Sequence, residues 1–375
     1  MELRKWLFGT LCCFALATSF ISCSDDDEPQ FNDEGSKVEL PGRRAFILYE
    51  GANVTSNNSG IAFYAPNGDA QFIKNIYYTQ NEKQLGSLGQ SMVEYENNIY
   101  VVVSGSKYIS KLNSACVEEG RYMIPAGEGD PRFIEAEDGF IYVTQYGGQV
   151  SKIDARTMER VLTFKGGDNL EGIVECNGKL YVANTYKGLY PNIVYNKEVL
   201  VINPHDMTLV QKVTVPDNPE RLFEEDGKVY LYSKGNYADI PNTLSVIDPL
   251  QNNKVTDLDI RASKIAEGND DMLYLVNNET EYDSNWNVVS SVNTFATYNT
   301  KTGAKGGSFL KDIPEKLKGS TIYLLAVDDE TGDIYVGITD YVTTGTIYRF
   351  DRNGNQNGES FDAGGINPNT MLFLD

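Results

Sequence analysis

The sequence holds a single histidine, His205, and only five cysteines. Histidine is the commonest metal ligand and the usual general base. With one histidine, the sequence lacks the residues for a histidine-based metal centre and has little basis for histidine-driven catalysis. His205 itself lies in the polar segment 203–206 and is interpreted as an exposed turn residue. Two cysteines far from the N-terminus, Cys116 and Cys176, have no motif around them. They fit either a disulfide of an exported protein or two buried thiols. These shortages favour a non-enzymatic protein without a metal or cofactor.

Basic residues are also scarce, because 32 Lys and Arg stand against 53 Asp and Glu. Removal of residues 1–22 takes away Glu2, Arg4 and Lys5, and leaves 30 basic and 52 acidic residues with a net charge of −22. Such a charge repels nucleic-acid phosphates and anionic headgroups. The composition therefore excludes nucleic acid as a partner and favours a neutral or cationic ligand.

Long apolar runs are absent except for residues 6–21, which are too short for the roughly 20 residues of a spanning helix. Arg4 and Lys5 precede this run, so residues 1–22 are predicted to be a signal peptide. The run ends in Phe-Ile-Ser-Cys, which resembles a bacterial lipobox, and Cys23 is predicted to carry lipid. An ordinary signal peptide with an incidental cysteine is the alternative.

The segment after Cys23 is acidic, with Ser-Asp-Asp-Asp-Glu at residues 24–28. It resembles the surface-export signal of Bacteroidetes lipoproteins, although a solvated acidic spacer has the same composition. Residues 23–42 are interpreted as a lipidated flexible tether. We therefore expect a protein anchored by lipid to the outer membrane and facing the cell exterior, in contact with the membrane through the lipid alone.

Residues 43–375 show no long helical periodicity. Short apolar and aromatic runs alternate with Gly, Asn and Asp turns, which is typical of an all-β domain. An aliphatic–Tyr pair recurs after a turn, and from Tyr100 to Tyr335 the interval averages about 47 residues. Propeller blades repeat at roughly 40–50 residues. The pairs end in Tyr100, Tyr142, Tyr181, Tyr230, Tyr274 and Tyr335.

Four antiparallel strands per repeat predict a seven-bladed β-propeller. Six blades are complete, with first strands near residues 91, 132, 171, 220, 262 and 321. The remaining blade has strands at 45–49, 60–64 and 71–75 but no first strand. Residues 367–374 resemble the blade openings at 130–133 and 218–221. We therefore expect the C-terminal strand to close the first blade. A ring of six or eight blades is the alternative.

Propeller geometry places the inter-blade loops and the hairpins between second and third strands on one face. Several of these hairpins are long (50–59, 184–198, 233–242 and 277–293) and aromatic. Exposed aromatics on one rim indicate a ligand platform, although any single tyrosine fits a loop anchor equally well. The predicted ligand-binding aromatics are Tyr146, Tyr186, Tyr190, Tyr195, Tyr237, Tyr282, Trp286 and Tyr341.

The starts of the first strands surround the central channel on the same face. Arg132 and Arg221 follow similar Pro-containing turns and are included in the predicted site. Inter-blade hydrogen bonding is an equally good interpretation of each. The other residues at these positions are Gln90, Glu171, Lys264, Thr321 and Asn369. The short hairpin at Tyr146 predicts a lopsided site that leans toward blades four to six.

The segments RAFILYEG, LGSLGQSMVEYENNIYVVVSGSKYISKLN and DPRFIEAEDGFIYVTQYGGQVSKID resemble the BtuG-like surface lipoproteins of Bacteroidetes, which are seven-bladed YncE-like propellers. The resemblance covers about residues 43–375. It implies capture of vitamin B12 (cobalamin) and related corrinoids, as a transported ligand and not as a cofactor. It also implies transfer to a BtuB-type, TonB-dependent transporter in the outer membrane. The long hairpin that carries Trp286 is a departure from this family. The resemblance does not show whether corrinoid binders have the same hairpin.

Two other classes of function remain open. A Tyr and Trp platform also stacks on sugars, so a glycan-binding protein is an alternative. A glycan-cleaving protein needs two carboxylates about 5–10 Å apart, and Glu171, Asp239 and Asp283 are not obviously paired. An adhesion or protein-interaction propeller would use the same face.

We expect Trp286→Ala to weaken ligand binding and to leave the melting temperature unchanged, because a rim tryptophan belongs to the ligand platform and not to the core. Ligand titration together with a thermal melt checks this. A lower melting temperature with intact binding would identify Trp286 as a loop anchor.

Overall fold

The computed structural model describes residues 31–188, 191–269, 271–283 and 288–374, with the backbone alone at Tyr282 and Val288. The signal peptide and residues 23–30 of the predicted tether, with Cys23, lie outside the described residues, and so do Tyr190 and Trp286. Residues 31–375 form one compact unit. In the part of the chain that the structure describes, no helix combines the length and the apolar character that crossing a membrane requires.

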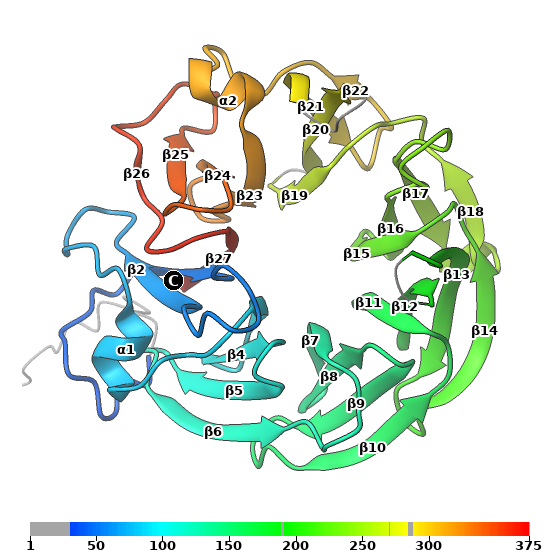
Figure 1. Cartoon of the computed structure of the whole chain (residues 1–375), viewed down its shortest axis with the longest axis horizontal. Coiled ribbons are helices and arrows are strands. Elements are labelled where there is room, and N and C mark those ends of the chain that lie inside the picture. The colour runs from blue at the N-terminus through cyan, green and yellow to red at the C-terminus, as the bar shows by residue number, and fades with distance from the viewer. Residues whose placement is uncertain (1–30, 189–190, 270, 284–287, 375) are drawn as a thin grey trace, which may run out of the picture. The chain divides into compact units, whose positions relative to one another are not determined.

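The compact unit is a seven-bladed β-propeller, as the sequence predicts (Figure 1). Successive strands pair antiparallel within each sheet, and the inner strands of neighbouring blades pack around the centre. Blade 1 consists of β1 (Arg44–Tyr49), β2 (Gly60–Tyr64) and β27 (Pro368–Leu374). Blade 2 consists of β3 (Gly89–Tyr95), β4 (Asn98–Val103), β5 (Tyr108–Asn113) and β6 (Glu118–Met123). Blade 3 consists of β7 (Pro131–Glu137), β8 (Phe140–Gln145), β9 (Gln149–Asp154) and β10 (Arg160–Lys165).

The remaining blades follow in chain order around the ring (Figure 1). Blade 4 consists of β11 (Asn169–Cys176), β12 (Lys179–Lys187), β13 (Val194–Asn203) and β14 (Thr208–Thr214). Blade 5 consists of β15 (Pro219–Glu225), β16 (Lys228–Ser233), β17 (Thr243–Asp248) and β18 (Lys254–Asp257), with a 3₁₀ turn at Pro249–Gln251. Blade 6 consists of β19 (Lys264–Gly268), β20 (Met272–Tyr282), β21 (Val288–Asn299) and β22 (Lys305–Gly306). Blade 7 consists of β23 (Thr321–Val327), β24 (Ile334–Thr339), β25 (Thr346–Phe350) and β26 (Phe361–Asp362).

The C-terminal strand closes the ring, which confirms the prediction. β27 pairs antiparallel with β1, and Met371 lies opposite Ile47. The outer position of this blade is reduced to a single bridge between Phe63 and Ile73, where a full strand over 71–75 was predicted. A short helix begins directly afterwards, α1 (Ile76–Asn81), because the Asn75 side chain accepts a hydrogen bond from the Tyr78 amide and caps it. A second short helix, α2 (Glu315–Gly319), precedes blade 7.

The repeated tyrosine has a structural cause. Tyr100, Tyr142, Tyr181, Tyr230 and Tyr335 are almost completely buried, and Tyr274 is partly buried. The Tyr100 hydroxyl donates to the Ala155 carbonyl of the next blade at 2.8 Å, and the Tyr181 hydroxyl donates to Asn253 at 2.6 Å. A buried ring with a polar tip can fill the space between two sheets and also satisfy a neighbour's backbone. The motif therefore joins one blade to the next.

Two hairpins differ from the prediction of long loops at 184–198 and 277–293. They are extensions of the sheets, because β12 and β13 pair as far as Lys187 and Val194, and β20 and β21 pair as far as Tyr282 and Val288. In blade 6 the polar residues form a side-chain ladder, in which Asn278 donates to Asn293 at 2.8 Å and to Ser291 at 3.0 Å. These cross-strand contacts stabilise a ribbon that composition alone indicates as a loop.

Truncation of the chain after residue 365 should prevent closure, because β1 then loses its partner strand and exposes a sheet edge. We expect aggregation on gel filtration and a melting temperature lower by about 10 °C or more. Deletion of Asp375 alone is the matched control. A monomer that melts like the full chain would contradict the role of β27.

Candidate functional site

The first strands share an irregularity at the end that lies on the face of the hairpins. In every blade except the one that begins with β19, the register of the first strand against its neighbour shifts near its start. A β-bulge of this kind redirects side chains and is common beside binding sites. We call this end of the channel the channel mouth. The residues at the shifts are Gln90, Arg132, Glu171, Glu220, Tyr323 and Asn369.

On one side of the channel mouth the polar groups satisfy one another. Arg132 forms a bidentate ion pair with Glu171 of the next blade, at 3.0 and 3.1 Å, and donates to Gln90 of the preceding blade at 2.7 Å. Tyr146 donates to the same Glu171 carboxylate at 2.6 Å. Burial and the Glu171 charge both raise the pKa of Tyr146. Arg132 and Tyr146 therefore hold blades 2, 3 and 4 together, which is the inter-blade interpretation of Arg132.

The other side of the channel mouth is open. A cavity of about 300 Å³ lies between β15 and β19 and extends to β23 and β27. Lys234 pairs with Glu220, and Tyr323 donates to Glu50 at 2.5 Å. The cavity is lined by Glu220, Arg221, Tyr232, Lys264, Tyr323 and Asn369 among others. Its position between blades 5 and 6 agrees with the lopsided site expected from the hairpin lengths.

The predicted rim aromatics form edge-to-face pairs above the channel mouth. Tyr146 packs on Tyr186 at 5.9 Å between ring centroids, and Tyr195 packs on Tyr237 at 5.8 Å. Tyr341 packs at 5.8 Å on Tyr323, a residue that the sequence analysis did not select. Tyr237 is 70 % exposed and Tyr341 is 53 % exposed, whereas Tyr146, Tyr186 and Tyr195 are partly buried.

Tyr237 and Tyr341 also share an unusual backbone. Their φ angles are +57° and +65°, in the left-handed region that bulky residues rarely adopt. Such strain is concentrated at functional sites in proteins. At Tyr341 it is held by the Thr339 hydroxyl, which accepts a hydrogen bond from the Tyr341 amide at 2.9 Å. The two most exposed rim tyrosines are therefore fixed in place by the local fold.

Further exposed apolar side chains lie in the hairpins between second and third strands. A solvated hairpin gains no stability from exposing such groups, and a contiguous apolar surface commonly marks a binding site. They are Val54, Val194, Tyr237, Val289, Val292, Tyr341 and Val342.

Sequence reasoning missed part of the site. Tyr323 occupies the bulge of β23, where Thr321 was expected, because the register shift moves the relevant position along the strand. Lys264 was placed correctly at the start of β19 but was left out of the binding residues. Tyr190 and Trp286 lie outside the described residues, and so does the side chain of Tyr282. His205 is exposed in its turn, and both Cys116 and Cys176 are buried free thiols.

The opposite end of the channel is acidic. A second cavity, of about 340 Å³, shares Leu222, Phe223 and Glu267 with the first. Its other lining residues include Glu135, Glu137, Glu175 and Glu224. Burial raises the pKa of Glu135 to about 8 and that of Glu267 to about 7, and neighbouring carboxylates add to both shifts. The channel therefore changes sign along its length.

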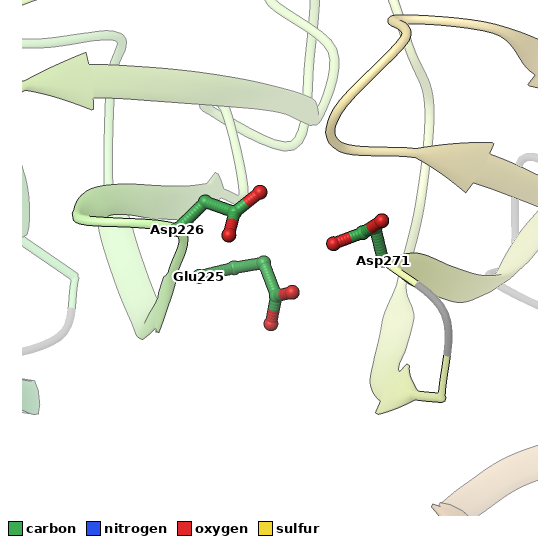
Figure 2. Close-up of side chains that lie close together, drawn as sticks. All are labelled: Glu225, Asp226 and Asp271. Atoms are coloured by element: carbon green, nitrogen blue, oxygen red, sulfur yellow. The ribbon is translucent and has the colours of Figure 1, made fainter.

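Three carboxylates also gather on the outer turns near this end. Figure 2 shows Glu225 at the end of β15 and Asp226 on the turn that follows, near Asp271 on the turn after β19. Oxygens of the three carboxylates lie within 4.8 Å of one another. Burial and the neighbouring acids raise the pKa of Glu225. Asp271 is partly neutralised by Lys301 at 3.5 Å. Carboxylates of this kind suit a hard cation, but the same arrangement is common on acidic surfaces, and we assign it no role.

Comparison with known proteins identifies the fold. A family model described as a domain of unknown function (DUF5074) matches residues 44–356. No curated protein matches the chain. The chain is similar to a functionally unknown protein from Desulfotomaculum acetoxidans, with 11 % identity, a TM-score of 0.57, and 88 % of this chain and 98 % of that one covered.

Two further solved structures share the arrangement of strands. A chain of Kuenenia stuttgartiensis hydrazine synthase has 16 % identity and a TM-score of 0.54, over 68 % of this chain and 74 % of that one. A streptogramin B lyase has 13 % identity and a TM-score of 0.52, over 73 % of this chain and 82 % of that one. At such identities the likeness concerns the fold alone.

The acidic end of the channel predicts a pH dependence of stability. The raised pKa values mean that the folded chain retains protons on Glu135 and Glu267 that the unfolded chain releases near pH 4.5. Stability should therefore fall as the pH rises from about 4.5 toward 8. Urea denaturation across this range should show a flatter profile for Glu135→Gln and Glu267→Gln than for the unaltered chain. Stability profiles of the variants that run parallel to that of the unaltered chain would contradict the raised pKa values of Glu135 and Glu267.

Proposed function

This chain belongs to the DUF5074 family, whose description assigns it no function. We therefore propose a function from the face that carries the hairpins between second and third strands, which we call the hairpin face. The protein captures a corrinoid such as cobalamin on this face and then releases it unchanged. No bond is made or broken, so the proposed role is that of a binding protein and not of an enzyme.

The observation that carries the proposal is the exposed aromatic and aliphatic rim around a polar channel mouth. Tyr237 and Tyr341 present their rings to solvent, and both have a left-handed backbone conformation. Large binding sites in proteins combine such apolar walls with a few convergent polar groups. Here Asn369, Arg221 and Lys264 supply the polar groups at the centre.

A corrinoid has the matching chemistry. It is a wide macrocycle with apolar edges and a fringe of amide groups, so tyrosine rings can pack against its edges while donors and acceptors at the channel mouth meet the amides. The hairpins of blades 4 and 6 are paired ribbons and not loose loops. Binding therefore orders few side chains, and this limits the entropy cost of association.

The remaining parts of the proposal rest on the N-terminal sequence and on the resemblance stated above. Lipid on Cys23 anchors the protein to the outer membrane, and the acidic segment between Cys23 and the compact unit holds the propeller outside the cell. A BtuB-type transporter in the same membrane receives the corrinoid. The transporter contacts the propeller on or beside the hairpin face, where contact can release the bound ligand.

The test is co-elution of cyanocobalamin with the chain that begins at Ser24, which contains the whole compact unit. We expect corrinoid absorbance to follow the protein peak on gel filtration. Tyr237→Ala and Tyr341→Ala should each weaken binding about tenfold, equivalent to about 1.4 kcal/mol. Tyr78→Ala is the control, because Tyr78 is 49 % exposed on α1, away from the hairpin face.

Absence of co-elution at micromolar concentrations would reject the corrinoid. A glycan array then tests the second candidate, for which the exposed rings of Tyr237 and Tyr341 are the specific support, because tyrosine also stacks on sugars. Binding to neither ligand would leave a protein partner as the occupant of this face.

A further inference from the structure

Two cations stand side by side at the open part of the channel mouth. Arg221 is the third residue of β15 and Lys264 is the first residue of β19, and both line the cavity of about 300 Å³. The Arg221 guanidinium lies over the Phe133 ring at 4.2 Å, and the Lys264 ammonium lies over the Tyr323 ring at 4.7 Å. The aromatic rings fix both charges at the wall of the cavity.

Neither charge is neutralised by direct contact. Within residues 31–188, 191–269, 271–283 and 288–374, no carboxylate forms an ion pair with Arg221 or Lys264. The nearby acids are already engaged, since Glu171 pairs with Arg132, Glu220 pairs with Lys234, and Glu50 accepts from Tyr323. The cavity wall therefore carries two positive charges that no carboxylate of the described residues contacts directly.

The surroundings agree with an uncompensated positive charge. Burial and the Arg221 charge lower the pKa of Lys264 to about 8, although Glu220 and Glu50 act in the opposite direction. Water reaches Arg221 from the cavity. Burial against the surrounding protein nevertheless lowers the pKa of Arg221, as it does for Lys264. The charged or titratable groups that face Lys264 are Glu50, Glu220, Arg221, Lys234, Glu267 and Tyr323.

We propose that Arg221 and Lys264 form a binding site for an oxyanion, that is, a phosphate, sulfate or carboxylate group, at the channel mouth. The arginine fork suits two oxygens of one group, and the lysine supplies a point charge beside it. Asn369 also lines the cavity, but its amide donates to the Gly89 and Gln90 carbonyls, so the two cations carry the site. The oxyanion site does not depend on which ligand the rim captures. It takes an anion, whereas the overall negative charge of the chain predicts a neutral or cationic ligand.

Calorimetric titration with sodium sulfate at constant ionic strength tests the site, using the chain that begins at Ser24. We expect one binding site, and at least a tenfold loss of affinity in Arg221→Met and in Lys264→Met. Lys254→Met is the matched control, because Lys254 is exposed on the outer strand β18. Arg221→Lys keeps the charge and should retain part of the binding. Equal binding by the unaltered chain and both Met variants, each with an unchanged melting temperature, would overturn the proposal.

The pH dependence gives an independent readout. Sulfate does not titrate between pH 6 and 10, whereas Lys264 loses its proton near pH 8. Affinity should therefore be constant below about pH 7 and should fall as the pH rises through 8, and Lys264→Met should lack this step. An affinity that is independent of pH in the unaltered chain would exclude Lys264 from the site.

The source of the oxyanion is settled by comparing two corrinoids. Cyanocobalamin carries a phosphodiester and dicyanocobinamide does not. If Arg221→Met weakens cyanocobalamin binding and spares dicyanocobinamide, the site takes an anionic group of the captured ligand. If the variant loses sulfate and binds both corrinoids as before, the site takes a free ion. Failure of both corrinoids to bind rejects the proposed function alone, because sulfate binding is measured without them.

Discussion

The pairing of β1 with β27 is the constraint on which the rest of the molecule depends. It turns a row of sheets into a closed ring, in which the inner strands of neighbouring blades pack on one another except where the cavity separates β15 from β19. Closure fixes the spacing of the blades, and hydrogen bonds from the buried Tyr100 and Tyr181 connect each of their blades to the next. The bulged starts of the first strands can therefore bring residues from distant parts of the chain to one point. Arg132, Glu171 and Gln90 meet there through hydrogen bonds that span about forty residues.

The fold could be predicted because it repeats. A strand at 60–64 and the closing strand near 367–374 agree with the structure almost residue for residue. Elements outside the repeat could not be predicted in this way. The helix α1 is only six residues long, and the Asn75 cap that starts it was assigned to a strand. The ribbon of β20 and β21 is rich in Asn, Ser and Thr, which indicate loops until their cross-strand hydrogen bonds are known.

The site was predicted less completely, and Arg132 and Arg221 show why. Both lie at a blade opening, but Arg132 directly follows Pro131, whereas Arg221 is the second residue after Pro219. Arg132 therefore corresponds to Glu220 at the register shift and pairs with an acid of the next blade, while Arg221 lines the cavity. The sequence shows this offset, but which carboxylates stand across the channel follows from ring closure. Composition selects the rim tyrosines, but the left-handed backbone of Tyr237 and Tyr341 becomes visible only in the structure.

The reversal of charge along the channel has a consequence for what can pass through it. Arg221 and Glu224 lie on the same strand and line the two cavities, about 10 Å apart by the rise of three residues. An electric field therefore runs along the axis of the ring, from the basic entrance toward the carboxylates. An anion that enters at the channel mouth is repelled more strongly the deeper it moves, whereas a cation is drawn onward. For an anion the two ends of the channel are therefore unequal, because the basic entrance attracts it and the acidic end repels it more strongly as the pH rises and Glu135 and Glu267 lose their protons.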